Sequence, residues 1–361
     1  MSDPGDRYVF PYANLADYQN WRKAVEPFAA RQIDPQGKTR FKIDRVMPIA
    51  SAGSCFARRI AQSLRNSGFN YYDAEAAPAW LSSQQRSDYN YGIWSARFGD
   101  VFTTLQLLQL LQRAIGEFEP VERFWIGRQS DEILDPFRPR IQPNGFRSID
   151  EMEAQRAFHL QAVQRLFNDI DVFIFTMGLT ETWCHLEDGA AYPVCPGRGI
   201  GTFDASKYRF RNLTVAENIE YLGRFLEIFR RFNPRARVIL SVSPVPLAAT
   251  FEDRHVITST TYTKAVLRVA AEEIRRSFKN VDYFASYELV MGTLNAGEYF
   301  QPDRRHINSM ALDLVMTSFY RNFSSEPETM PNIPNPSAAT ANLDPCDEDL
   351  LLEMIERDSE R

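Results

Sequence analysis

The pattern of apolar and polar positions predicts strands and helices that alternate along the chain. Short runs rich in β-branched and aromatic residues predict buried strands at 46–50, 171–175, 238–242 and 281–284. Apolar residues that recur every three to four positions predict helices at 56–67, 103–115, 148–167, 214–234, 260–278, 287–294 and 309–323. Small hairpins are expected at 124–133 and 183–194. This order predicts an α/β fold with a parallel sheet of about five strands and helices on both faces.

The same pattern divides the chain of 361 residues into three parts. Residues 1–45 carry aromatic side chains without a period, which predicts an irregular N-terminal arm packed on the core. Residues 46–324 form the predicted domain, and residues 325–361 form an acidic tail that we expect to be mobile. The tail holds ten acidic residues against Arg357 and Arg361, so the net charge of −6 leaves residues 1–324 at about +2. A body so close to neutral argues against nucleic acid as a partner.

Composition narrows the class of protein further. No apolar run reaches the roughly 18 residues that span a membrane, and residues 1–20 lack the apolar segment of a signal peptide. Four cysteines are too few for a disulfide scaffold, so a cytoplasmic location is expected. The sequence leaves the oligomeric state open.

The first candidate for chemistry is the turn between the strand at 46–50 and the helix that follows it. Ser54 and Cys55 stand there, at the carboxyl edge of the predicted sheet, where α/β proteins bind ligands. The N-terminus of a helix lowers the pKa of a thiol, and Arg58 and Arg59 add positive charge nearby. The alternative is a buried cysteine that packs as a small hydrophobic residue.

Two more polar groups follow predicted strands. Gly178, Thr180, Glu181 and Trp183 come after the strand at 171–175, where amides and hydroxyls could hold a developing oxyanion. The alternative there is a glycine turn with Glu181 as a cap or an ion-pair partner.

Asp303 precedes His306 by three residues, a spacing that lets the carboxylate fix Nδ1 and leaves Nε2 as a base. No metal or other cofactor is expected, because His185, Cys184 and Cys195 lack a second cluster of ligands.

The segment Gly53-Ser54-Cys55-Phe56-Ala57 is the signature of the GSCFA-domain proteins, and 283–288 also resembles them. That family is similar to the SGNH (GDSL-type) hydrolases. The resemblance implies a three-layer α/β/α sandwich with a flavodoxin-like parallel sheet, into which loops and hairpins are inserted. It also implies esterase or acyl-transfer activity.

The SGNH motifs imply roles for single residues. Cys55 takes the place of the nucleophile, although Ser54 stays open as the attacking group, and His306 and Asp303 match the last motif. The oxyanion would be held by Gly99 and by Thr180, which stands where the superfamily has asparagine. Gly178, Glu181, Trp183 and Arg58 would surround the substrate.

The implied activity is acyl transfer or ester hydrolysis on a carbohydrate or polysaccharide, with an acyl thioester as a possible donor. Tryptophans at positions 80, 94 and 183 are candidates for contact with a glycan. The alternative is an SGNH-like module that binds a glycan or an acyl carrier without turnover.

Overall fold

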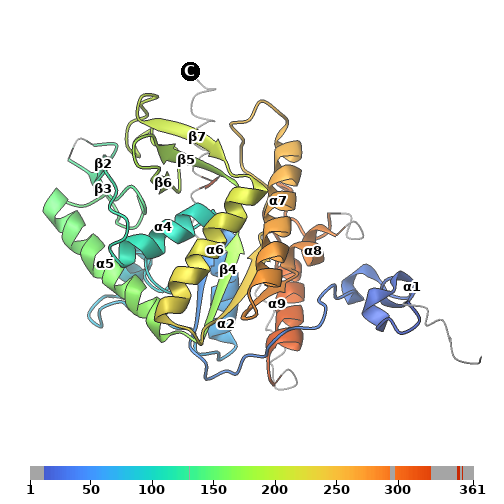
Figure 1. Cartoon of the computed structure of the whole chain (residues 1–361). Helices are drawn as coiled ribbons and strands as arrows, with labels where there is room; N and C mark the ends of the chain where they lie inside the picture. Colours follow the sequence, from blue (N-terminus) through green and yellow to red (C-terminus); the bar gives the residue numbers. More distant parts are fainter. Residues whose placement is uncertain (1–11, 130, 293–296, 327–347, 350–351, 353–361) are drawn as a thin grey trace, which may run out of the picture.

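A sheet of four parallel strands lies at the centre of the molecule. The computed structural model describes residues 12–129, 131–292, 297–326, 348, 349 and 352. The strands stand across the sheet in the order β1 (Ile49–Gly53), β4 (Val172–Met177), β8 (Arg237–Val242) and β9 (Val281–Phe284). Nearly all of their residues are buried. Helices cover both faces, which confirms the predicted three-layer α/β/α fold (Figure 1).

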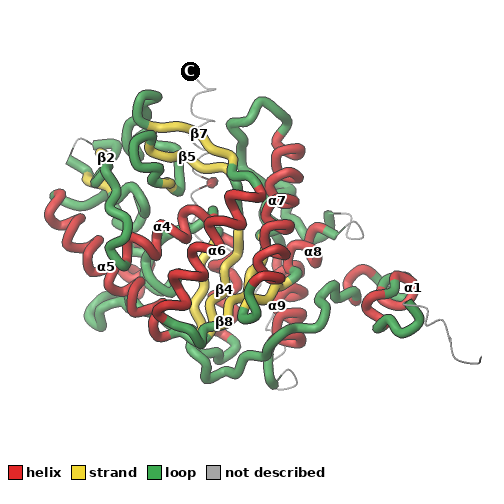
Figure 2. Tube along the Cα trace, in the orientation of Figure 1, coloured by secondary structure: helices red, strands yellow, loops and turns green. Residues whose placement is uncertain are grey.

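The two helical layers are built from different parts of the chain (Figure 2). One face packs against α4 (Thr104–Ala114), α5 (Ile149–Asp169), α6 (Val215–Phe232) and α7 (Val256–Ser277). The other packs against α2 (Cys55–Asn66), α8 (Ser286–Met291) and α9 (Ser309–Phe323). Side chains alternate along β4, so that Phe173 and Phe175 enter the first layer while Val172 and Ile174 enter the second.

The expected fifth strand is reduced to a single bridge beside β1. Ile49 pairs in parallel with Tyr71, through the amides of Ile49 and Tyr72. The Tyr71 hydroxyl then bonds Ser51 Oγ at 2.7 Å, and the chain leaves the sheet edge. After β1 the chain thus passes first to one side of this strand, at Tyr71, and later to the other side, where β4 pairs with it. Such a reversal in strand order opens a crevice at the carboxyl ends of β1 and β4.

Short antiparallel sheets are inserted around this core. Both predicted hairpins are present, as β2 (Trp125–Ile126) with β3 (Ile133–Leu134) and as β5 (Glu181–His185) with β6 (Ala191–Tyr192). The third strand beside β5, β7 (Tyr208–Asn212), was not predicted. This three-stranded sheet lies beyond the carboxyl end of β4 in Figure 1, next to the crevice. The short helix α3 (Ser83–Asp88) lies between β1 and α4 in the chain.

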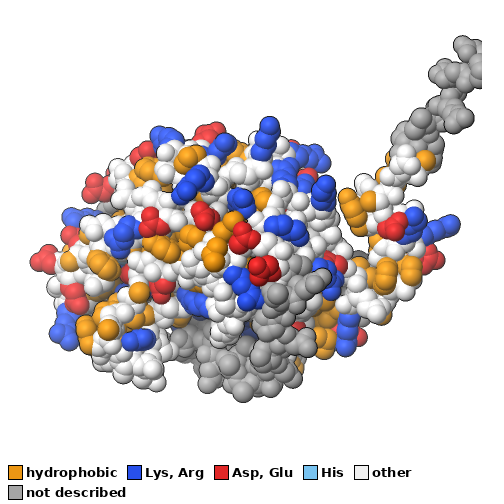
Figure 3. Space-filling model, turned by 90° about the horizontal axis from the view of Figure 1, so that it is seen from below, with side chains coloured by type: hydrophobic (Ala, Val, Ile, Leu, Met, Phe, Trp, Pro, Cys, Tyr) orange, Lys and Arg blue, Asp and Glu red, His pale blue; other side chains and the backbone are white. Residues whose placement is uncertain are grey.

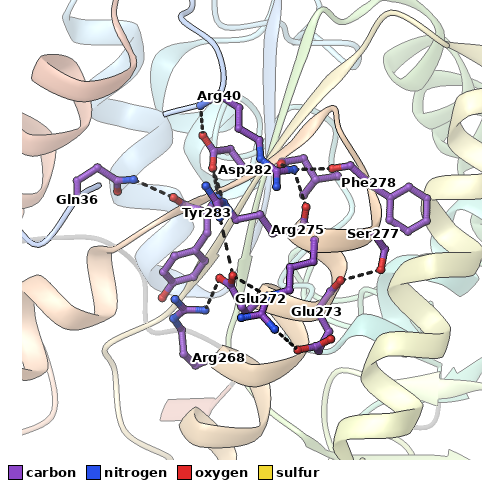
Figure 4. A network of polar contacts seen from close by, with 12 residues as sticks. Gln36, Arg40, Arg268, Glu272, Glu273, Arg275, Ser277, Phe278, Asp282 and Tyr283 are labelled. Carbon is purple, nitrogen blue, oxygen red and sulfur yellow. Dashed lines mark hydrogen bonds and ion pairs between the residues drawn. The ribbon is translucent and has the colours of Figure 1, made fainter. Parts of the chain in front are cut away.

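The described part of the N-terminal arm contacts the body mainly through its last residues, from position 34 onward. Its turns η1 (Asp17–Gln19), α1 (Trp21–Ala24) and η2 (Ala30–Gln32) contain no buried residue, and this region stands apart from the body (Figures 1 and 3). Figure 4 shows how the following residues attach: the Arg40 amide donates to Asp282 at 2.7 Å, and Gln36 bonds the backbone of Tyr283. Before these residues, Arg31 pairs with Glu298 of the body at 3.2 Å, and the packing of the whole arm on the core stays a prediction.

Candidate active site

Cys55 lies at the N-terminus of α2, directly beyond β1. The turn needs glycine at position 53, because its φ is +147° and a Cβ there would lie 2.5 Å from the Thr176 carbonyl oxygen. Ser54 is the N-cap residue and is buried, but its side chain bonds no amide of α2. The first amides of a helix have no partner within the helix, so this end keeps its positive character beside the thiol.

Two cations lie within electrostatic range of the thiol. Burial lowers the pKa of Arg59, and the charge of Cys55 opposes that shift. Arg59 also donates from NH1 to the Ile307 carbonyl at 3.1 Å, which ties α2 to the loop that carries His306. Burial likewise lowers the pKa of Lys264 to about 8, against the charges of Glu348 and Cys55. The thiol therefore lies at a helix N-terminus and within electrostatic range of two basic side chains.

Sequence reasoning missed Lys264. The residue is 1% exposed, and its Nζ donates to the Gly178 carbonyl at 2.7 Å. It comes from the buried face of α7, which also carries Leu267 and Ala271. A lysine in phase with that apolar stripe was the available signal, since an unpaired ammonium is costly to bury.

The predicted hydrogen bond between Asp303 and His306 is present. Asp303 Oδ2 lies 2.5 Å from His306 Nδ1, and Oδ1 of the same carboxylate accepts the amides of Arg305 at 3.0 Å and His306 at 3.1 Å. The carboxylate thus fixes both the loop and the orientation of the imidazole, as such a pair does in catalytic triads.

The other ring nitrogen of His306 faces the acidic tail. Its Nε2 lies 3.3 Å from Asp349 Oδ1. Asp349 also pairs with Arg305, whose NH2 lies 3.3 Å from Glu348 Oε2. The bonds to Asp349 and then to Asp303 raise the pKa of His306 to about 9, so the ring is an imidazolium at neutral pH. In this arrangement His306 cannot act as a general base.

The groups after β4 are bonded within the protein. The Gly178 amide donates to the Phe102 carbonyl at 2.9 Å. The Thr180 side chain is fully buried, and its hydroxyl lies 2.7 Å from Asn212 Oδ1 and 2.9 Å from Thr263 Oγ1. Glu181 accepts from the Thr250 hydroxyl at 2.7 Å. The expected oxyanion role of Thr180 therefore gives way to a positioning role, because its hydroxyl already joins β7 and α7.

Arg58 and Gly99 support the site from the side. Arg58 forms a buried two-point ion pair with Asp100 and stacks 4.8 Å from the centroid of the Trp94 ring. These contacts give Arg58 a structural role, and its expected contact with substrate stays a prediction. Gly99 adopts a φ of +77° in the turn just before Asp100.

A cavity of about 880 Å³ opens beside this cluster. Its lining includes Leu179, Leu247 and Glu348. Trp183 also lines it, with Phe203 and Phe251 packed edge-on at 5.2 and 4.9 Å between ring centroids. The structure separates Trp183 from the other tryptophans proposed for substrate contact: Trp80 is 80% exposed on the surface, and Trp94 is buried under Arg58.

The histidine–cysteine group weighed for a metal does not assemble. Cys184 is buried next to Arg211, while His185 Nδ1 lies 3.5 Å from Asp188. Among the residues that the structure describes, no three His, Cys, Asp or Glu side chains form a possible metal site. In the same part of the chain, no helix is both long and apolar enough to cross a bilayer.

Comparison with protein families gives one match, which covers residues 48–319. The chain belongs to the GSCFA family. The GSCFA region runs from the residue before β1 into α9, so it contains Cys55, Lys264, Asp303 and His306. Glu348 and Asp349 lie outside it. No curated protein matches the chain by sequence.

Proposed function

We propose that this GSCFA protein is an acyl-transfer enzyme whose nucleophile is Cys55 and whose acceptor is a carbohydrate. The observation that carries the proposal is the position of the thiol. It lies at the N-terminus of α2, beside the reversal in chain direction between β1 and β4, within electrostatic range of Lys264 and Arg59. This combination favours a thiolate, the reactive form of cysteine. The similarity of the signature to that of the SGNH hydrolases supports the same reaction class.

The reaction would proceed in two steps. The Cys55 thiolate attacks the carbonyl carbon of an acyl thioester, and the tetrahedral intermediate collapses to acyl-Cys55 with release of the donor thiolate, which takes up a proton. A sugar hydroxyl then attacks acyl-Cys55, loses its proton to a base and leaves as the ester, which regenerates the Cys55 thiolate. Water in place of the sugar would give hydrolysis.

The surrounding residues would each support a different part of the reaction. His306, oriented by Asp303, would take the acceptor proton once its Nε2 atom is free of Asp349. The Cys55 amide at the N-terminus of α2 would donate to the oxyanion, and Gly99 remains a candidate for a second amide. The Lys264 ammonium would stabilise the negative charge on sulfur and then on oxygen.

The cavity beside the site would hold the substrate. Its wall of Trp183, Phe203 and Phe251 offers flat apolar surfaces, and such surfaces with a few polar groups are typical of small-molecule sites.

A non-catalytic binding module is the second candidate. The observation that favours it is the bond between His306 and Asp349, which occupies the nitrogen that a base would need. The same cavity and cations would then hold a glycan or an acyl carrier without turnover.

Release of the donor thiol distinguishes the acyl-transfer enzyme from the non-catalytic binding module. The protein is incubated with acyl thioesters and soluble glycans, and products are quantified by chromatography. We expect thiol release that Cys55→Ala abolishes, that Ser54→Ala retains in part and that the control Cys184→Ala, at a buried cysteine outside the cavity lining, leaves unchanged. Loss with Ser54→Ala and retention with Cys55→Ala would make Ser54 the nucleophile. Full activity in both variants, or no release by the wild type, would refute the proposal.

A further inference from the structure

Glu348 and Asp349 contact basic side chains and a backbone amide of the body. Glu348 Oε1 accepts the Ala248 amide at 3.2 Å, and its Oε2 lies 3.3 Å from Arg305 NH2. Asp349 pairs with Arg305 and His306. The side chains of Glu348 and Asp349 are only 10% and 18% exposed. Both carboxylates are therefore largely buried in this contact, unlike those of an exposed surface ion pair.

The donors come from three elements of the body. Lys264 belongs to α7, the Ala248 amide to the loop after β8, and Arg305 and His306 to the loop before α9. Lys264 is within electrostatic range of both Glu348 and Cys55, so the carboxylates reach the charge environment of the thiol. We call the group of Lys264, Arg305 and the Ala248 amide the basic subsite; His306 lies beside it and bonds Asp349.

The occupants and the subsite belong to different parts of the chain. The GSCFA match contains the whole subsite but ends at residue 319, before both carboxylates. Lys264 and Arg305 are only 1% and 8% exposed, and burying cations in this way is costly without an anion beside them. The family region by itself therefore provides a place for an anion, and this chain fills it with its own side chains.

We propose that the basic subsite binds a carboxylate or phosphate group of the substrate, and that Glu348 and Asp349 occupy it as a reversible internal inhibitor until that group displaces them. The identity of the ligand as a substrate rests on the proposed function. The occupation itself does not, because it concerns only which carboxylates reach Arg305 and His306. While Asp349 holds His306 Nε2, the acceptor hydroxyl has no base; displacement frees the base and admits the substrate in one event.

Two alkylating reagents that differ in charge, one anionic and one neutral, test the subsite through their reaction with the Cys55 thiol. Iodoacetate carries a carboxylate and iodoacetamide does not, so the ratio of their rates at Cys55 cancels any change in the reactivity of the thiol itself. Rates are read on the Cys55 peptide by mass spectrometry. In Glu348→Gln/Asp349→Asn we expect the iodoacetate to iodoacetamide ratio to rise about tenfold or more, because the emptied subsite attracts the anion.

Three comparisons make the result specific. Inorganic phosphate should lower the raised ratio, and adding Arg305→Gln to the double variant should return it to the wild-type value. The charge-matched control Glu220→Gln/Glu227→Gln, on the exposed side of α6, should leave the ratio unchanged. An unchanged ratio in the double variant would overturn the proposal. So would a tenfold loss with both reagents, since the carboxylates would then belong to the catalytic machinery.

A binding measurement covers the case in which Cys55 reacts with neither reagent, which would count against the proposed function alone. A fluorescent peptide of residues 347–357 is titrated with the full-length double variant and with the wild type. We expect it to bind the double variant, to be displaced by phosphate and to bind the wild type more weakly, because the linked segment competes at high effective concentration. A peptide with Glu348→Gln and Asp349→Asn should not bind. Equal binding of both peptides, or no binding to the double variant, would overturn the proposal.

Discussion

The imidazole of His306 forms an ion pair with Asp349, with 3.3 Å between Nε2 and Oδ1. Since Asp303 holds Nδ1, both ring nitrogens face carboxylates. Asp349→Asn should therefore lower the pKa of His306 from about 9 toward its ordinary value, because the bond to Asp349 is the largest cause of the shift. An NMR titration of the imidazole, assigned with His306→Gln, measures it. A pKa that stays near 9 would show that Asp349 is not the cause.

The same shift predicts how stability depends on pH. A histidine whose pKa is raised in the folded state stabilises the fold fully below about pH 6.5 and loses that contribution as the pH rises through about 9. The difference in unfolding free energy between the wild type and His306→Gln should thus shrink from pH 6 to pH 10. Urea denaturation at both pH values provides the measurement, with Glu220→Gln as a control whose difference stays constant. A gap that widens with pH would contradict the assignment.

For Lys264 we predict a contribution to stability that rises with pH, opposite to that of His306. Its folded-state pKa of about 8 lies below the ordinary value, so the unfolded chain binds more protons between pH 8 and pH 10.5. The wild type should therefore gain stability relative to Lys264→Met across that interval. In the same variant, alkylation of Cys55 at pH 7 should slow, because a cation near the thiolate is lost. An unchanged rate of alkylation would show that Lys264 does not affect the reactivity of the thiol.

The buried pair of Arg58 and Asp100 predicts a loss of stability without a direct chemical role. Their side chains are 6% and 0% exposed. Asp100→Asn leaves the guanidinium without its charge partner, and breaking a buried pair in this way costs about 3–5 kcal/mol. The exposed pair of Glu220 and Arg224 is the control, and Glu220→Gln should cost under about 1 kcal/mol. Equal losses in the two variants would argue against the structural role of Asp100.

Trp183 tests the cavity as the acceptor site. Trp183→Ala should raise the KM for a glycan acceptor about two- to tenfold while acylation of Cys55 by the donor is unchanged, since loss of an aromatic contact costs roughly 0.5–1.5 kcal/mol. Trp80→Ala is the matched control, because that side chain is on the surface. A change in the acylation rate would place the acyl group, and not the sugar, against Trp183.

The layers of the fold could be predicted because each strand and helix carries its own periodicity. The helix expected at 309–323 and the strand expected at 281–284 have those bounds in the structure, and the Asp303–His306 bond follows from a spacing of three residues in one loop. Such signals are local, so one sequence contains them. Local signals could not predict that the fifth strand is reduced to a single bridge at Tyr71. That outcome depends on contacts with β1, such as the bond between the Tyr71 hydroxyl and Ser51.

The parts of the site that escaped prediction depend on contacts between distant segments. The Thr180 hydroxyl looks available in sequence, but Asn212 and Thr263 take it up once β7 and α7 pack together. The acidic tail was expected to be separate because its composition resembles that of mobile segments, yet Glu348 and Asp349 meet Arg305. The other residues of the expected tail, apart from 325, 326 and 352, lie outside the described residues. Charge complementarity across a fold cannot be read from the charge of one segment.

Mass spectrometry of the protein quenched during reaction with an acyl thioester tests the central claim most directly. The account predicts one acyl group per chain, located on the Cys55 peptide, absent in Cys55→Ala and lost when a glycan acceptor is added, with the ester as the product. Product formation without any adduct on Cys55, or an adduct on Ser54 or Cys195 in its place, would contradict it.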